Sequence, residues 1–491
     1  MDIMLFISSF IFYLCICSAR ASFLASPPQN ALIVAFEDTY DMSLLANTLS
    51  DQGIDATLII PSTASDVYEH LVDVQVLKIN IFEEEFIKPE SKALKACEQL
   101  LTDKKILKKI QELQPTFTIF PAIRHDGCLI PWTKSIRSIP VVWTLGSNEE
   151  LYTFLQTGSA LPLNTDGFMI TMVSNLKGKF YISSLRSSYV DPALNLVSKY
   201  LRNVDFNLEN LYNDVELILW GGDVVLRSNF APLTELLIEV GCHHCRGVQP
   251  LPQTLQQELI EFRLGTIVSL LDASHLTLIE EIAKKLPQGR QGQAIVWKQK
   301  NVSLAEKPEN LFIYTDVDRQ DIIGYPRTRV LLSHCADTEL LESAFHGTPV
   351  ICFPRSLAES KNAMRVFELG FAYSSRGDFS TEAILAGINE VHNKPEYREN
   401  ARKVSLAVRD RPTPAMDRVI FWLHYAGRIK TEGENLLLPL KNVSTYGETL
   451  QFLSGIAIGT LFSIFATMLY IATRFASVNE RQHKNKGKYK R

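Results

Sequence analysis

The sequence predicts an α/β protein made of two doubly wound, Rossmann-like domains followed by one C-terminal membrane-spanning helix. In each half of the chain, short apolar runs alternate with helical patterns, which is typical of a parallel sheet covered on both faces. At 491 residues, 46% hydrophobic and 21% charged, the chain is globular in composition and too long for a single core. A long uncharged stretch near the C-terminus indicates the helix.

The first domain is predicted over residues 22–245. Its opening has a β-α-β pattern, in which a helical segment at 42–49 separates two apolar runs, and a longer helical pattern extends from 91 to 113. The predicted strands of this domain are 31–36, 56–60, 117–120 and 140–143.

The second domain is predicted over residues 246–440, because the alternating pattern restarts after Pro250-Leu251-Pro252. Two such domains that face each other would bind ligands at the carboxyl ends of their strands. The predicted strands are 265–271, 294–297, 311–314, 330–333 and 349–353, and the predicted helices are 276–285, 338–345 and 360–369.

The two ends of the chain predict targeting and anchoring. Residues 1–21 resemble a signal peptide, with an apolar core and small residues before the cleavage point. Residues 452–473 carry no charge and are long enough to span a bilayer. The tail at 474–491 holds seven basic residues against one acidic residue, which places it in the cytosol. We therefore expect a single-pass type I protein with a lumenal body.

This orientation suggests modification and association sites. Asn301 and Asn442 lie in Asn-x-Ser sequences, so both are candidate glycan acceptors in a lumenal body. Gly455 and Gly459 form a small-xxx-small pair in the membrane segment. That pair predicts a homo- or heterodimer through the helix.

The charge of the chain argues against nucleic acid as a partner. The net charge is −4, and the basic residues are concentrated in the tail, so the body is acidic. An acidic body without a basic stripe has no means of attracting phosphate backbones.

Six cysteines lie in the body, which is too few over this length for a disulfide scaffold. One local cluster stands out, Cys242-His243-His244-Cys245. It offers metal ligands without a second half at zinc-site spacing. A metal site, a disulfide and ordinary packing all remain open for it.

A specific resemblance lies in residues 325–370. They read YPRTRVLLSHCADTELLESAFHGTPVICFPRSLAESKNAMRVFELG. This segment resembles the signature of the UDP-glycosyltransferases, especially the membrane-bound UDP-glucuronosyltransferases of animals. Cys97-Glu98, Pro250-Leu251-Pro252 and the anchor with its basic tail are similar to family features in the same order.

The resemblance implies a GT-B glycosyltransferase fold in the endoplasmic reticulum membrane. It implies transfer of a hexosyl or glucuronosyl group from a UDP-sugar to a small lipophilic acceptor, with no metal and no other cofactor. The N-terminal domain would hold the acceptor and the C-terminal domain the UDP-sugar. On the donor side it implies that His334 contacts the diphosphate, that Glu342 holds the ribose hydroxyls, and that Asn362 also contributes.

The sequence departs from the family at the catalytic pair. Asp38 stands where the family has its catalytic His, and Pro121 stands where it has the partner Asp. Asp38 and the neighbouring pair His125-Asp126 are therefore the candidate replacement bases.

The donor side also departs from the family. Cys335 replaces a glycine near the phosphates, Asp316 replaces the Trp that stacks on uracil, and Arg319 replaces a Gln that reads the base edge. Losing several polar contacts, at roughly 1 to 3 kcal/mol each, would weaken nucleotide binding. A catalytically inactive family member that acts as a binding or partner subunit is therefore the alternative function.

Overall fold

The computed structural model describes residues 29–488, apart from gaps at 38, 65–70, 72, 82–87, 145–179, 181–182, 202–210, 227–236, 300–301, 303, 305, 316, 374–376 and 433–444. The predicted signal peptide, Asp38, Asn301, Asp316 and Asn442 lie outside the described residues.

The first half of the chain forms a seven-stranded parallel sheet in the order β3-β2-β1-β4-β5-β6-β7. Along β1, Leu32 and Val34 enter the core on one face of the sheet, and Ala31 and Ile33 enter the core on the other. The strands are β1 Asn30–Val34, β2 Asp55–Pro61, β3 Gln75–Ile79, β4 Phe117–Pro121, β5 Ile139–Thr144, β6 Leu217–Trp220 and β7 Leu237–Glu239. The main helices around it are α2 Thr39–Asp51, α3 Pro89–Thr102, α4 Lys104–Leu113, α5 Asp126–Ser135 and α8 Asp191–Tyr200.

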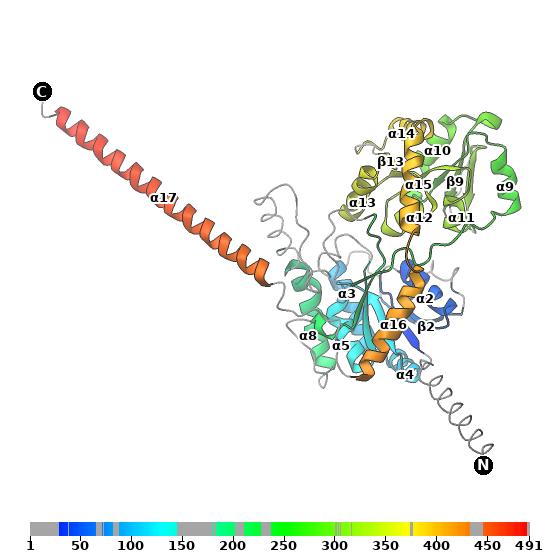
Figure 1. Cartoon of the computed structure of the whole chain (residues 1–491), viewed down its shortest axis with the longest axis horizontal. Coiled ribbons are helices and arrows are strands. Elements are labelled where there is room, and N and C mark those ends of the chain that lie inside the picture. Colours follow the sequence, from blue (N-terminus) through cyan, green and yellow to red (C-terminus); the bar gives the residue numbers. More distant parts are fainter. Residues whose placement is uncertain are drawn as a thin grey trace, which may run out of the picture.

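The second half forms a six-stranded parallel sheet in the order β10-β9-β8-β11-β12-β13. Its strands are β8 Thr266–Ser269, β9 Ala294–Lys298, β10 Leu311–Tyr314, β11 Thr328–Ser333, β12 Val350–Cys352 and β13 Ala372–Tyr373. Its main helices are α9 Gln253–Ile260, α10 Leu276–Lys285, α11 Arg319–Ile323, α12 Asp337–His346, α13 Leu357–Glu368, α14 Thr381–Asn393 and α15 Pro395–Arg409. The two doubly wound sheets confirm the predicted fold class, and Figure 1 shows that they belong to two separate domains.

The helical pattern expected from 91 to 113 divides into α3 and α4 at Asp103. The Asp103 carboxylate accepts hydrogen bonds from the backbone N–H groups of Lys105 (2.9 Å) and Ile106 (3.2 Å). An aspartate with extended backbone that caps these donors starts a new helix. Sequence periodicity alone did not reveal this break.

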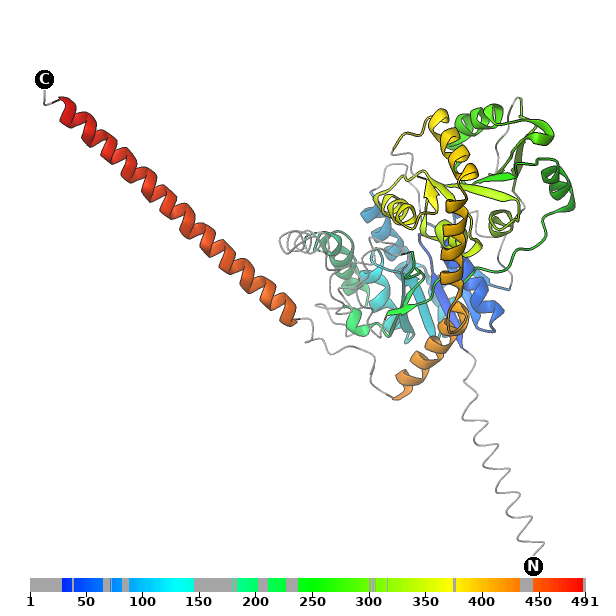
Figure 2. The same ribbon diagram turned by 45° about the horizontal axis from the view of Figure 1, so that its top comes forward.

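Helix α16 (Ala415–Glu432) returns to the first sheet after the second domain is complete. Val419 and Leu423 are fully buried in the core that also contains Met42 of α2 and Val141 of β5. Residues 415–432, which the sequence division assigned to the second domain, therefore pack against the first (Figure 2).

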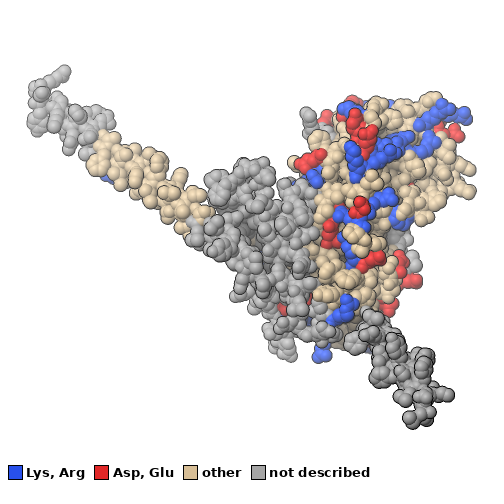
Figure 3. Space-filling view, viewed as in Figure 1, with Lys and Arg blue, Asp and Glu red and all other residues tan. Residues whose placement is uncertain are grey.

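Helix α17 (Thr445–Lys488) projects away from the body. Its segment Ser454–Ala476 has a mean hydropathy of 1.9 and no buried part, so by length and composition it can cross a membrane. Figure 3 shows this segment as an almost uncharged surface. The span agrees with the predicted residues 452–473.

The six body cysteines form three disulfides, Cys97–Cys128, Cys242–Cys245 and Cys335–Cys352. The first joins α3 to α5, and the third joins the loop after β11 to the end of β12. Complete pairing was not predicted from the sequence, because spacing alone does not fix which cysteines meet. Paired cysteines are typical of an oxidising compartment.

We expect Leu423→Ala to lower the free energy of unfolding by about 2 to 5 kcal/mol, because it leaves a cavity between α16 and the first sheet. Thermal unfolding of the purified protein measures the change. Phe421→Ala on the same helix is the control, since Phe421 is 54% exposed and should cost little. Equal effects of the two substitutions would show that α16 is not part of this core.

Candidate functional site

Glu342 is the centre of a charged network between the two domains. This carboxylate on α12 is 1% exposed and accepts hydrogen bonds from Arg319 Nε (2.5 Å) and Arg319 Nη2 (2.6 Å). His244 Nε2 lies 2.9 Å from the same carboxylate. Burial by itself would raise the pKa of Glu342, but Arg319 and His244 lower it to about 2. Glu342 is therefore ionised at neutral pH.

The first domain closes over this network from the start of α2. The Arg319 guanidinium lies 4.9 Å from the centre of the Tyr40 ring, and the Thr338 hydroxyl donates to the Asp41 carboxylate at 2.5 Å. Burial is the main cause that raises the pKa of Tyr40, to about 12, and it also raises the pKa of Asp41. These contacts join α2 of the first domain to the second domain, and Asp41 and Thr338 are 297 positions apart in the chain.

The network leaves Glu342 with little capacity for another ligand. A carboxylate has about four lone-pair sites, and Arg319 and His244 already occupy three of them. The position that the resemblance assigns to the ribose hydroxyls is thus filled by side chains of the protein. A ribose could be gripped there only if Arg319 moved.

His334 lies at the carboxyl end of β11 and is 2% exposed. Its Nδ1 is 2.9 Å from the carbonyl oxygen of Phe353, so Nδ1–H donates and Nε2 is left as the acceptor. The backbone N–H of Asp272 approaches Nε2 at 3.4 Å. The imidazole is held in one orientation, with Nε2 turned toward the loop that follows β8.

That loop carries a second ionic cluster around Asp272. Its carboxylate caps the backbone N–H of Ser274 (3.1 Å) and lies 3.1 Å from both His275 Nδ1 and Arg355 Nη1. Hydrogen bonds from Ser274 are the first cause that keeps the pKa of Asp272 below its usual range. Asp272, His275 and His334 offer ligand atoms within 4.8 Å of one another, yet Arg355 already neutralises the carboxylate.

Asn362 supports the loop between β11 and α12. Its side-chain amide donates to Asp337 Oδ1 (2.9 Å) and to the Cys335 carbonyl oxygen (3.2 Å). Cys335 has a φ of 62°, in the left-handed region that favours glycine, and its side chain is fully buried in the disulfide with Cys352. Cys335 thus keeps the backbone conformation expected of a glycine, but its disulfide sulfur occupies the space that a glycine would leave open.

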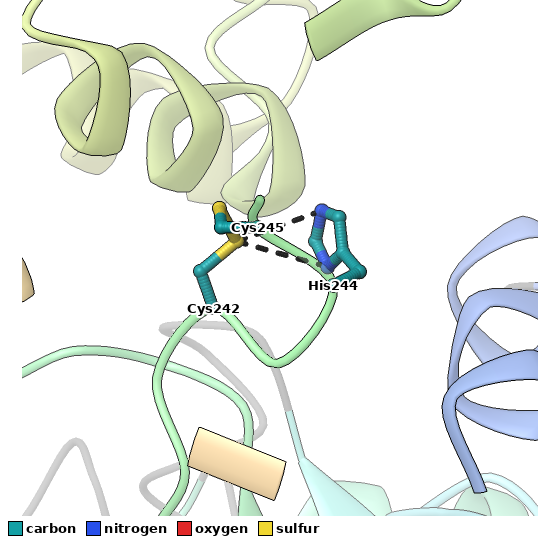
Figure 4. Close-up of side chains that lie close together, drawn as sticks. All are labelled: Cys242, His244 and Cys245. Atoms are coloured by element: carbon teal, nitrogen blue, oxygen red, sulfur yellow. Dashed lines mark hydrogen bonds between the residues drawn. A yellow bond between two sulfur atoms is a disulfide. The ribbon is translucent and has the colours of Figure 1, made fainter. Parts of the chain in front are cut away.

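The Cys242-His243-His244-Cys245 cluster is a disulfide in the structure, one of the three alternatives left open by the sequence. Figure 4 shows the bonded sulfur atoms beside the His244 ring, whose Nε2 and Nδ1 lie 3.6 and 3.7 Å from Cys242 Sγ. Bonded sulfurs are not thiolate ligands, so this oxidised cluster does not form a metal site.

The candidate bases lie at the carboxyl end of β4, after Pro121. His125 is 3% exposed and packs against the Phe36 ring at 5.1 Å, so it is a buried group and not the surface histidine that its loop position indicates. Neither ring nitrogen has a hydrogen-bond partner among the described residues. Burial lowers the pKa of His125 to about 4.

Asp126 does not orient His125. Its Oδ2 accepts from the Tyr212 hydroxyl at 2.7 Å, and burial raises its pKa to about 7. Within the described residues, His125 and Asp126 are not hydrogen-bonded to each other. His125 instead packs against Phe36, two residues after the end of β1, and does not form a His-Asp pair with Asp126.

The sequence reasoning missed the roles of Arg319, His244 and Tyr40. The sequence presents Arg319 only as the residue in place of a base-reading Gln, and His244 only as part of the Cys242–Cys245 cluster. A buried glutamate requires a cation, which is the one signal that could have suggested a partner for Glu342. No sequence pattern says which cation it is.

Comparison with known proteins agrees with this fold. The family profile described as UDP-glucoronosyl and UDP-glucosyl transferase matches residues 35–490. The chain is 23% identical to UDP-glucuronosyltransferase 2A3 of Mus musculus over 404 residues, covering 77% of this chain and 72% of that protein. It is 25% identical to UDP-glucuronosyltransferase 2B19 of Macaca fascicularis over 423 residues, covering 77% and 73%.

Solved glycosyltransferases share the architecture. The calicheamicin glycosyltransferase CalG4 superposes with a TM-score of 0.56 at 15% identity, covering 82% of this chain and all of that one. LpCGTa, solved in complex with UDP, superposes with a TM-score of 0.53 at 13% identity, covering 82% and 100%. The fold is therefore that of the GT-B glycosyltransferases, and the chain belongs to the UDP-glucuronosyl and UDP-glucosyl transferase family.

Proposed function

We propose that this protein transfers a hexosyl or glucuronosyl group from a UDP-sugar to a small lipophilic acceptor. Family membership over residues 35–490 is the observation that carries the proposal. His334 at the carboxyl end of β11, with Nε2 as its acceptor nitrogen, occupies the position assigned to the diphosphate. When protonated at Nε2, the imidazole can donate to the leaving diphosphate and stabilise its charge.

On the donor side, Glu342 and Asn362 belong to the proposed site in different roles. Glu342 would bind ribose hydroxyls after Arg319 swings away, whereas Asn362 holds the Asp337 end of α12 in place. No metal and no other cofactor takes part in the proposed reaction, since the charge is met by protein groups. Nucleotide binding is consequently coupled to a rearrangement of Arg319.

On the acceptor side, we propose His125 as the general base, with Asp38 as the alternative candidate and Asp126 in a structural role. His125 is a neutral imidazole near the end of β1, and its nitrogens have no partner among the described residues. Because its ring nitrogens are unpartnered among the described residues, the acceptor nitrogen of His125 is available for the proton of an acceptor hydroxyl, whereas the Asp126 carboxylate is already held by Tyr212.

A catalytically inactive binding or partner subunit is the second candidate function. The observation that favours it is the occupied Glu342 carboxylate, with Arg319 and His244 in place of a ribose. Breaking a buried ion pair costs about 3 to 5 kcal/mol, which is a large part of a micromolar affinity near −8 kcal/mol. In this role the protein would keep the fold and associate with a partner.

The membrane helix supports a proposal about place and assembly. We propose a type I orientation in the endoplasmic reticulum membrane, with Ser454–Ala476 spanning and the body lumenal, where Asn301 and Asn442 can carry glycans. Added Cβ atoms at Gly455 and Gly459 would meet nothing within 4 Å, so this helix face is open for a second helix.

The enzyme function predicts product formation when the full-length protein receives UDP-sugars and lipophilic alcohols or phenols. His334→Ala should lower kcat by roughly 10² to 10³, because a donor to the leaving diphosphate is lost. Mass spectrometry of the products measures the rate. If the wild-type protein forms no product, and millimolar UDP does not raise its melting temperature, the enzyme function is wrong.

Arg319→Gln should tighten UDP binding by roughly tenfold, because it frees lone pairs of Glu342. Isothermal titration measures the dissociation constant, and the melting temperature checks that the variant folds. Glu342→Gln, with Arg319 intact, is the matched variant and should not tighten binding. A dissociation constant unchanged by Arg319→Gln would show that Glu342 does not hold the ribose.

His125→Gln should lower kcat by roughly 10² to 10⁴, as expected for loss of a general base. Because burial lowers the pKa of His125 to about 4, the base stays unprotonated at neutral pH, and the rate should fall only as pH drops toward 4. His392→Gln on α14 is the control and should have no effect. If His125→Gln turns over at the wild-type rate, His125 is not the base, and Asp38 is the remaining candidate.

A further inference from the structure

The Cys242–Cys245 disulfide lines a cavity that the proposed glycosyl transfer does not use. The cavity has a volume of about 400 Å³ and lies between the loop after β7 and the segment that joins α15 to α16. This volume falls within the range of roughly 300 to 1,000 Å³ that is usual for small-molecule sites.

The walls of the cavity carry an excess of positive charge. Its lining includes three arginines, Arg409, Arg411 and Arg418, against one carboxylate, Asp223. Arg411 Nη2 lies 2.7 Å from Asp223 Oδ1 and 3.2 Å from Glu239 Oε1, so the group holds three arginines against two carboxylates and keeps one positive charge in excess.

The other two arginines supply the excess. Arg418 donates to the Val240 carbonyl oxygen at 3.1 Å, and Arg409 lies 5.2 Å from the centre of the Phe345 ring. Neither has an ion pair with a carboxylate in the part of the chain that the structure describes. The cavity therefore favours an anionic ligand.

The disulfide on this wall is more accessible than the other two. Cys97, Cys128 and Cys335 are at most 1% exposed and Cys352 is 7% exposed, whereas Cys242 and Cys245 are half-buried beside the cavity. Thiol attack on a disulfide requires access to a sulfur atom. The two-residue spacing between Cys242 and Cys245 is also that of redox-active cysteine pairs.

His244 provides a group that can assist the leaving sulfur. Both ring nitrogens lie close to Cys242 Sγ, Nε2 at 3.6 Å and Nδ1 at 3.7 Å, and Nε2 also lies 2.9 Å from Glu342. An imidazole N–H this close to the sulfur can stabilise a thiolate forming on Cys242. This makes Cys242 the better leaving group and Cys245 the sulfur that is attacked.

We propose that the Cys242–Cys245 pair is a thiol–disulfide exchange site whose cavity binds an anionic low-molecular-weight thiol. The thiolate attacks Cys245 Sγ, the sulfur–sulfur bond breaks, and Cys242 leaves as a thiolate that takes up the proton lost by the incoming thiol. A second thiol molecule then releases Cys245. In total, two thiols are oxidised to one disulfide and the protein disulfide is reduced to two thiols. The site does not depend on glycosyl transfer.

Reduction with two thiols of opposite charge tests the site. The full-length protein in detergent is exposed to reduced glutathione or to cysteamine at equal thiolate concentration, and new thiols are alkylated and quantified by peptide mass spectrometry. We expect Cys242 and Cys245 to react before the other four cysteines, and glutathione to react roughly tenfold faster than cysteamine. Equal rates for the two thiols, or reduction of another disulfide first, would overturn the proposal.

Variants on α15 connect that preference to the cavity. Arg409→Gln should reduce the preference for glutathione, and Arg402→Gln, an exposed position on the same helix outside the cavity, should not. Arg418→Gln should also reduce the preference for glutathione. If Arg418→Gln does not fold, Arg409→Gln alone still tests the cavity, because Arg409 is exposed and its substitution should not affect folding.

A trapping experiment identifies the attacked sulfur. The oxidised wild-type protein is treated briefly with reduced glutathione and quenched with iodoacetamide, so that the first mixed disulfide is captured. Peptide mass spectrometry should find glutathione on Cys245 and the alkyl group on Cys242, because Cys242 is the leaving sulfur. Absence of an adduct on Cys245 would contradict the proposed role of that sulfur.

Discussion

The ion pair between Arg319 and Glu342 organises the region where the two domains meet. Glu342 is on α12 of the second domain, and its partners reach it from α11 and from the loop that leaves the first domain through His244. Tyr40 on α2 covers the guanidinium from the first domain. A buried carboxylate must have a cation, so these elements cannot separate without exposing or isolating a charge.

This network determines which contacts the side chains of the signature segment, residues 325–370, can make. The segment forms β11, α12 and β12 with the expected spacing, and His334 is held in one tautomer by the Phe353 carbonyl oxygen. The backbone conformation of a glycine persists at Cys335, but the disulfide with Cys352 fills the adjacent space. The backbone of the signature segment is thus retained, while the side chains of Glu342 and Asn362 make contacts within the protein.

His244 connects the network to the disulfide beside it. The same ring contacts Glu342 through Nε2 and has both nitrogens within 3.7 Å of Cys242 Sγ, so the loop between the domains joins a charged site and a sulfur pair. The three disulfides agree with a body that folds in an oxidising compartment, and α17 supplies a helix able to anchor it. Both features agree with the type I orientation proposed above.

The sequence by itself determined the parallel α/β architecture, the apolar C-terminal helix and the family, because apolar runs, uncharged length and the spacing within residues 325–370 are local properties of the chain. It also predicts His334, Glu342 and Asn362 as candidate donor-site residues. Only the tertiary structure decided that Arg319 and His244 neutralise Glu342, that the six cysteines pair, and that α16 packs on the first sheet. Those outcomes depend on which distant residues meet in space, and a buried charge or thiol does not specify its partner through sequence spacing.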